Sequence, residues 1–173
     1  KGQQTMTLPV RAFQVLIDVL SSTRYLVSGD SMLPALASRQ SVMAVRLRFS
    51  WSRLRRGDAV VLRHPAWSGH IYIKRVIGLP DEVLRIEDGR VYLNGVLLEE
   101  PYLDGPSTKR DELDREWWTG PDEYFVMGDN RGDSQDSRAF GPVDRRLILG
   151  RVWLRCWPPR AWGPVAGKDR HRR

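Results

Sequence analysis

Short apolar runs separated by turn residues follow one another from Ser41 onward, and this pattern constrains the fold more than any other feature of the chain. The runs are rich in Val, Ile, Leu and Tyr, which is typical of β-strands. Asp-Gly and Asn-Gly pairs at residues 88–89 and 94–95 favour tight antiparallel hairpins because they tolerate positive φ. The expected strands are Val42–Leu47, Ala59–His64, His70–Ile77, Val83–Glu87, Arg90–Leu98, Tyr124–Met127 and Arg151–Cys156.

The two ends of the chain and one internal stretch depart from this β pattern. Pro9–Leu20 carries apolar residues at three- and four-residue spacing, which predicts a short amphipathic helix. Residues 104–122 combine Gly-Pro pairs with dense charge, which indicates a loop or small insertion. The expected organisation is a helical segment over residues 1–23, a β domain over 24–165 and a disordered basic tail over 166–173.

Length, charge and cysteine content limit the classes of function. The 173 residues suit one domain, and the net charge of +7 favours an anionic partner, either nucleic acid or lipid headgroups. The single cysteine, Cys156, excludes an internal disulfide and multiple-cysteine zinc sites. The most apolar early stretch, Val10–Leu20, is interrupted by Arg11, Gln14 and Asp18 and is shorter than the roughly 20 residues that span a bilayer, so we expect no transmembrane helix in this sequence.

Ser31 lies in a turn-forming stretch that reads Ser28-Gly29-Asp30-Ser31-Met32-Leu33-Pro34. The glycine and the proline bend the chain, so the serine can project its hydroxyl while backbone N–H groups point toward a developing oxyanion. A plain surface turn uses the same residue types. A nucleophilic role for Ser31 therefore requires a base elsewhere in the chain.

Lys74 is the strongest candidate for that base. Histidine is the usual partner of a serine nucleophile, but His64 and His70 flank a predicted turn and His171 lies in the basic tail. Lys74 lies within the apolar run Ile71–Ile77, where alternation places it on one face with apolar neighbours. Burial lowers the pKa of an ammonium and leaves a neutral amine that can accept the serine proton. The alternative is that Lys74 lies on an edge strand or extends its amine to water and has no catalytic role.

A polar stretch, Met127–Arg138, begins where the strand Tyr124–Met127 is expected to end. It contains three Asp, two Arg, two Ser and one Asn, a composition that suits a hydrogen-bonded turn network. It lacks the closing glutamate of an EF-hand calcium loop, and Arg131 and Arg138 are interleaved with its carboxylates. We therefore expect no metal site here.

Four ordered blocks of the sequence resemble bacterial signal peptidase I, a Ser-Lys serine peptidase of the S26 type. They are Ser28–Leu36, Gly57–Val61, Tyr72–Pro80 and Gly128–Val143. The resemblance implies an endopeptidase of the cell membrane that removes signal peptides from exported preproteins on the extracytoplasmic side, with its anchor absent from this chain. It also implies antiparallel β-sheets in a partly open barrel or sandwich as the catalytic core, with the short N-terminal helix and the small insertion, and no metal or organic cofactor.

The resemblance also implies roles for single residues. Ser31 matches the nucleophile, Lys74 the general base and Ser134 the residue that hydrogen-bonds and orients the lysine. Some family members carry, at the position of Gly29, a serine whose hydroxyl helps to bind the oxyanion, so here the oxyanion hole would rest mainly on the backbone N–H of Ser31. Asp136 and Arg138 match the structural ion pair of the family. Asp129 and Asn130 belong to the same stretch, which begins with Gly-Asp-Asn-Arg at residues 128–131 and is called the box below.

The family's specificity for small residues before the scissile bond requires shallow apolar pockets beside the nucleophile. The candidates for their lining are Met32, Leu33, Ile73 and Val76. A substrate would bind as an added strand, with backbone hydrogen bonds for affinity and small pockets for selectivity. The expected partners are therefore signal peptides of preproteins.

The tryptophans suggest a second partner, the membrane lipid surface. Tryptophan favours the bilayer interface, so we expect Trp51 and its basic neighbours Arg53, Arg55 and Arg56 to touch lipid. The alternative is that most tryptophans pack in the core, and for Trp153 we expect core packing.

Three other classes share part of this pattern. A LexA-like self-cleaving repressor has Ser-Lys chemistry, but the 30 residues before Ser31 are too few for its helix-turn-helix domain. A conjugative-transfer peptidase of the same superfamily would have a similar sequence. A basic nucleic-acid-binding β-barrel would explain the charge but leaves the apolar setting of Lys74 and the Asp-rich box without a purpose, so we expect no nucleic-acid partner.

Overall fold

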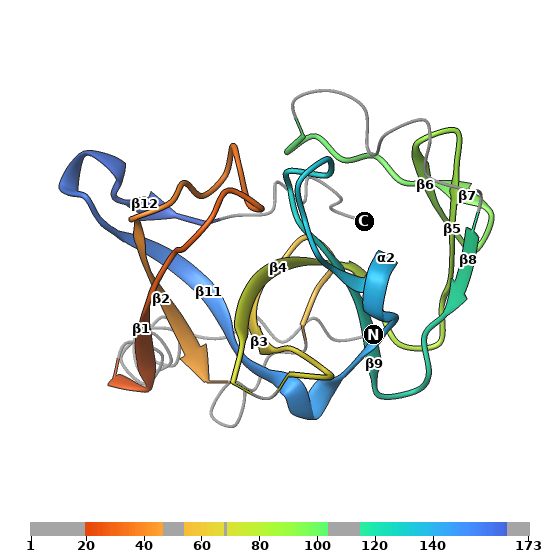
Figure 1. The fold of residues 1–173 in the computed structure, drawn as a ribbon, viewed down its shortest axis with the longest axis horizontal. Helices are drawn as coiled ribbons and strands as arrows, with labels where there is room; N and C mark the ends of the chain where they lie inside the picture. The colour runs from red at the N-terminus through yellow and green to blue at the C-terminus, as the bar shows by residue number, and fades with distance from the viewer. Residues whose placement is uncertain (1–19, 47–53, 68, 104–114, 166–173) are drawn as a thin grey trace, which may run out of the picture.

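The computed structural model describes residues 20–46, 54–67, 69–103 and 115–165 (Figure 1). The strands of the larger sheet are β1 (Ser22–Leu26), β2 (Ser41–Arg46), β3 (Ala59–Arg63), β4 (Ile71–Gly78), β9 (Glu123–Met127), β10 (Val143–Asp144), β11 (Ile148–Trp157) and β12 (Gly163–Pro164). The smaller sheet contains β5 (Val83–Glu87), β6 (Arg90–Leu93), β7 (Val96–Leu97) and β8 (Arg115–Trp118). The short helices are α2 (Ser137–Phe140), η1 (Arg145–Leu147) and η2 (Pro159–Ala161).

The larger sheet is antiparallel and open. Its strands run in the order β1-β2-β11-β3-β4-β9-β10, with β12 added to β11. The smaller sheet has the order β7-β6-β5-β8 and lies to one side of the larger one, at the right of Figure 1. Within the described residues the strand order does not close into a barrel, and the expected fold class, mainly β with antiparallel sheets in a partly open core, is confirmed.

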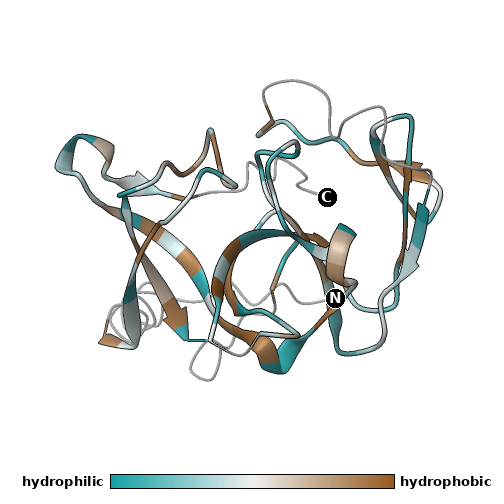
Figure 2. Ribbon diagram, in the orientation of Figure 1, coloured by the Kyte–Doolittle hydropathy of each residue, from teal (hydrophilic) through white to brown (hydrophobic). Residues whose placement is uncertain are grey.

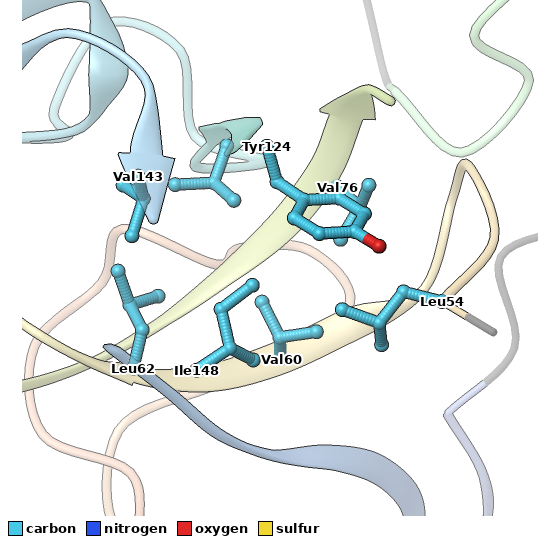
Figure 3. Packing of buried hydrophobic residues seen from close by; sticks show 8 residues of the cluster. Leu54, Val60, Leu62, Val76, Tyr124, Val143 and Ile148 are labelled. Atoms are coloured by element: carbon cyan, nitrogen blue, oxygen red, sulfur yellow. The ribbon is translucent and has the colours of Figure 1, made fainter. Parts of the chain in front are cut away.

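The central strands of the larger sheet are buried on both faces. Since successive residues of a strand point to opposite sides, one strand contributes to two hydrophobic clusters. On β3, Val60 and Leu62 join one cluster, whereas Ala59 and Val61 join another. Figure 3 shows the first cluster, which brings together Leu54, Val60, Leu62, Val76, Tyr124, Val126, Val143 and Ile148. Hydrophobic stretches along the central strands are visible in Figure 2. The smaller sheet is attached by a third cluster, made of Ile77, Leu84, Ile86, Val91, Leu93, Phe125 and Met127.

Both predicted hairpins are present. Glu87 pairs with Arg90 around Asp88 and Gly89, whose φ angles are 48° and 71°. The Asn94-Gly95 turn has φ angles of 49° and 81° and joins β6 to β7. Positive φ at both turn residues matches the right-handed twist of the flanking strands. The second turn also corrects the prediction of one strand over residues 90–98, because the chain reverses there.

Four strands were not expected: β1, β8 and the two-residue strands β10 and β12. β1 pairs with β2 along its whole length and begins at Ser22, before the expected domain start at residue 24. Arg115–Trp118, which we expected in a loop, forms β8 against β5. Residues 104–114 of that predicted insertion (104–122), the predicted helix up to residue 19 and the tail 166–173 lie outside the described residues.

Trp153 is also placed differently from the prediction. It is only partly buried and belongs to none of the three clusters formed by the described residues. Its indole Nε1 donates to Ser22 Oγ at 2.9 Å, so its polar edge faces the edge strand rather than the core. No helix among the described residues is long and apolar enough to cross a membrane.

Candidate active site

Ser31 lies in the loop between β1 and β2, where burial of the following residue fixes its position. Met32 is 1% exposed within the second cluster, and its carbonyl accepts the Leu36 N–H at 2.8 Å. Ser31 itself remains partly exposed. Gly29 has a φ of 79°, in the left-handed region that favours glycine. This backbone angle explains why glycine occupies that position.

Lys74 reaches Ser31 from β4, although the two residues are 43 positions apart. The Lys74 Nζ donates to Ser31 Oγ at 2.8 Å and to Ser134 Oγ at 3.1 Å. The residue is only 3% exposed. Burial lowers the pKa of its amine to about 8, while the negative charge of Asp136 acts in the opposite direction. The neutral fraction of the amine is therefore much larger near neutral pH than for an ordinary lysine, and it increases as pH rises toward 8.

Asp136 organises the hydrogen-bonded group behind Lys74. Its Oδ2 accepts the Ser134 hydroxyl at 2.7 Å and the Gly128 N–H at 2.9 Å, and its Oδ1 accepts Arg138 Nε at 2.8 Å. Burial raises the pKa of Asp136. The hydrogen bond and charge of Arg138, together with the other donors, outweigh this effect, so the pKa lies below its ordinary value. The carboxylate stays ionised and directs the Ser134 oxygen lone pairs toward Lys74.

Asn130 and Asp129, the other two predicted residues of the Gly128–Arg131 turn, contact the loop that carries Ser31 and the strand β4. The Asn130 backbone N–H donates to the Ser31 carbonyl at 3.0 Å, and its side-chain Nδ2 donates to the Asp30 carbonyl at 3.2 Å. Asp129 is paired with Arg75, whose Nε lies 2.7 Å from Asp129 Oδ1. Both partners of this ion pair are buried, so the box is attached to β4 as well as to the loop of Ser31.

A groove with a volume of about 490 Å³ opens over the Ser31–Lys74 pair. Met32 and Ile73, two of the expected pocket residues, line it. The other two do not belong to it. Val76 is fully buried in the first cluster, and Leu33 is not among the described residues that line the groove. Val76 is on the same face of β4 as Lys74, but it lies two residues farther along the strand, where the first cluster encloses it.

Gly128 is a site residue that we did not predict. A Cβ atom at this position would lie 2.2 Å from Ser134 Oγ and 2.5 Å from the Ser31 carbonyl oxygen. Only glycine allows the box to approach the nucleophile loop this closely. The signal was present in the sequence, because the box begins with this glycine directly after a predicted strand.

His64, one of the candidates for a serine partner, has a structural role instead. His64 is buried, and its Nδ1 accepts the N–H groups of Ala66 and Trp67 at 3.1 and 3.0 Å. Burial lowers its pKa, so the ring is held in the neutral form that this acceptor role requires. Among the described residues, no group of three or more His, Cys, Asp or Glu side chains is placed to hold a metal ion.

Comparisons with known proteins agree with this geometry. Residues 3–157 match the model of the family described as signal peptidase, peptidase S26. A signal peptidase I from Leptolyngbya laminosa is 35% identical over 95% of this chain and 83% of its own length. One from Bacillus caldolyticus is 36% identical over 79% of this chain and 80% of its own. A crystal structure of a signal peptidase I from Enterococcus faecalis V583 superposes with a TM-score of 0.52 at 31% identity, covering 59% of this chain and 98% of that one.

The open antiparallel fold, the buried amine beside a serine hydroxyl and these matches together define a hydrolase of the peptidase class. The chain belongs to the signal peptidase I family, peptidase S26. This assignment confirms the resemblance of the four sequence blocks. It is favoured over the LexA-like, conjugative-transfer and nucleic-acid-binding alternatives.

Proposed function

We propose that this chain removes signal peptides from exported preproteins by a Ser-Lys mechanism, with Ser31 as nucleophile and Lys74 as general base. The observation that carries the proposal is the 2.8 Å hydrogen bond between Lys74 Nζ and Ser31 Oγ at a nearly buried lysine. A serine hydroxyl needs a base within this distance to become a nucleophile. The pKa of about 8 makes Lys74 suitable for that role.

In the proposed reaction, the neutral Lys74 amine takes the hydroxyl proton while Ser31 Oγ bonds to the scissile carbonyl carbon. The oxyanion that develops is stabilised by the Ser31 N–H, which has no acceptor among the described residues. The Lys74 ammonium then gives its proton to the leaving amine, and an acyl ester remains on Ser31. Water hydrolyses this ester with Lys74 again as the base, and Ser134 keeps the amine aligned throughout.

The groove suits an extended peptide. β4 pairs with β3 from Ile71 onward but with β9 only from Arg75, so the other edge of Ile71–Lys74 has no strand partner in the described sheet. Across the groove, β1 is the last strand of the larger sheet. A substrate strand can therefore pair with backbone groups beside the Ser31–Lys74 pair. Met32 and Ile73 supply apolar walls, which favours small residues before the scissile bond.

We further propose that the enzyme works at the extracytoplasmic membrane surface. Leu26 and Trp157 pair with Ser41 from opposite sides, so they lie in one row across the sheet, and they are 69% and 52% exposed. Leu26 also lines the groove. This apolar row beside the groove supports contact with lipid.

The basic cluster that we expected to touch lipid is less suited to that role. Arg56 is half-buried, pairs with Glu82 at 2.6 Å and donates to a backbone carbonyl of β4. Arg55 is exposed. Trp51 and Arg53 lie outside the described residues. Arg56 is therefore removed from the proposed lipid surface, because its guanidinium is already engaged.

The proposal is tested by cleavage of a peptide with an Ala-x-Ala site, in detergent and across pH. Wild type should cut after the second Ala, and Ser31→Ala and Lys74→Ala should lose activity while remaining folded. Arg90→Ala, at an exposed position of the smaller sheet, serves as the control and should cleave normally. If the folded Ser31 and Lys74 variants cleaved like wild type, the proposal would be wrong.

A further inference from the structure

Glu100 is a buried carboxylate that the proposed reaction does not use. It follows β7 in the segment that leaves the smaller sheet, and its side chain is 3% exposed. Its carboxylate accepts hydrogen bonds from both terminal nitrogens of Arg131, with 3.0 Å between Nη1 and Oε2. The Tyr102 hydroxyl donates to Oε1 at 2.6 Å. A buried charge needs such partners, because an unpaired one carries a large desolvation cost.

Arg131 transmits this contact to the turn beside the nucleophile. Its Nε donates to the Gly128 carbonyl at 2.9 Å. The same turn donates the Asn130 N–H to the Ser31 carbonyl and the Gly128 N–H to the Asp136 carboxylate. The Arg131 guanidinium thus supports a turn that contacts two parts of the site. These parts are the Ser31 backbone and the Asp136 carboxylate, which in turn accepts the Ser134 hydroxyl.

Tyr102 closes the network on the other side. Its ring lies over the Arg75 guanidinium, 4.4 Å from ring centroid to Cζ, and Arg75 is paired with Asp129 of the same turn. Two guanidinium groups and two carboxylates, paired as Arg131 with Glu100 and Arg75 with Asp129, therefore share one buried region. Removal of a single charge upsets the balance of charge in a site of low dielectric.

We propose that Glu100 is a positioning residue for the peptidase reaction, acting through Arg131 on the turn of residues 128–131. The inference rests on the proposed roles of Ser31 and Lys74. Glu100 is not among the described residues that line the groove, so its effect should fall on the chemical step and not on substrate binding. Through this contact, the segment that follows the smaller sheet would help to position the residues of the reaction.

The test compares Glu100→Gln with Glu99→Gln in steady-state cleavage of the Ala-x-Ala peptide. Glutamine keeps the size of the side chain and removes its charge, and Glu99 is the exposed neighbour. For Glu100→Gln we expect kcat to fall about tenfold or more with KM within about twofold of wild type, because a displaced nucleophile loses alignment. Glu99→Gln should match wild type in both constants.

Tyr102→Phe provides a milder test if Glu100→Gln fails to fold. It removes only the hydroxyl that donates to Glu100 and keeps the ring over Arg75. We expect a smaller decrease in kcat, again without a change in KM. Melting curves of each variant show that the measured protein is folded.

Two results would overturn the inference. One is a folded Glu100→Gln or Tyr102→Phe protein with wild-type kcat, even if its melting temperature is lower. The other is a rise in KM at unchanged kcat, which would place the effect in substrate binding. Ser31→Ala is measured in the same assay. If Ser31→Ala is inactive while Glu100→Gln matches Glu99→Gln, the inference fails and the proposed function stands; full activity of Ser31→Ala refutes the function itself.

Discussion

Lys74 illustrates how much of the proposed chemistry depends on the surroundings of one residue. Its amine is enclosed by β3, β4 and the 128–138 stretch and makes hydrogen bonds to two hydroxyl groups. The aromatic ring of Tyr72 lies 5.3 Å from the amine. Each neighbour stabilises an orientation of Nζ toward Ser31, and the burial decides how easily the amine loses its proton.

The pH dependence of activity follows from this burial. Lys74 must be neutral to accept the Ser31 proton, so the active form accumulates as pH rises through its pKa of about 8. We expect kcat/KM to increase with pH and to level off above that value. The pH profile of kcat/KM, which reports groups of the free enzyme, checks this. A profile that is flat across neutral pH would contradict the role of Lys74 as base.

A glycine substitution tests the close contact between the box and the nucleophile loop. In Gly128→Ala the new methyl group would meet Ser134 Oγ and the Ser31 carbonyl, both closer than real Cβ contacts allow. We expect activity to fall about a hundredfold or more, because the reacting groups must separate. Gly69→Ala is the control, since a Cβ there meets nothing within 4 Å. Equal activity of the two variants would refute this explanation.

The sequence could indicate residue types at the site but not their distances. Ser31 and Lys74 were predicted because a glycine–proline turn and an apolar strand are local features. Asp129 and the Asp136–Arg138 pair were expected from the family resemblance, but the buried roles of Arg75 and Glu100 were not, since both resemble ordinary surface residues within their own segments. Their partners lie 54 and 31 positions away, and only the folded sheet brings them together.

Among the elements, α2 is short but carries a disproportionate role because Asp136 is its N-cap. The side chain accepts the Arg138 N–H and also binds the Arg138 guanidinium. The same carboxylate orders Ser134. The helix start and the orientation of the proposed base are therefore set by one group.

Asp136→Asn should destabilise the protein by about 3–5 kcal/mol at neutral pH, because it replaces a fully buried carboxylate that accepts hydrogen bonds from the Arg138 guanidinium and the Ser134 hydroxyl. Chemical denaturation measures the change. Asp136 has a lowered pKa in the folded state, so its contribution is present above the unfolded pKa and is lost as pH falls through the folded one. The control Asp144→Asn removes a pair whose Arg146 is 89% exposed. Equal effects of the two variants would contradict the argument.

The success of the strand predictions varied with burial. β3, β4 and β9 are apolar on both faces, and their residue pattern was sufficient to find them. β1 and β8 were missed because no residue of either is fully buried and polar residues interrupt them, with the sequences Ser-Thr-Arg-Tyr-Leu and Arg-Glu-Trp-Trp. Their strand conformation comes from pairing with β2 and β5, which single-strand propensity does not contain.

For the whole molecule, the charge and the exposed apolar row together predict how it meets a membrane. The net charge of +7 should attract anionic vesicles, and the row of Leu26 and Trp157 should insert at their surface. We expect flotation with such vesicles to decrease at high salt. Trp157→Ser should weaken it further, whereas Trp118→Ser, in the smaller sheet and 60% exposed, should not. Absence of wild-type flotation would exclude the lipid surface.

The position of β11 has a consequence for how the protein matures. This late strand lies between β2 and β3, and in the larger sheet it is the link between the half that carries Ser31 and the half that carries Lys74. Pairings between segments so distant along the chain form slowly, and β11 can join β2 and β3 only after the chain has been synthesised as far as Trp157. We therefore expect Ser31 and Lys74 to come together, and activity to appear, only once β11 has been inserted.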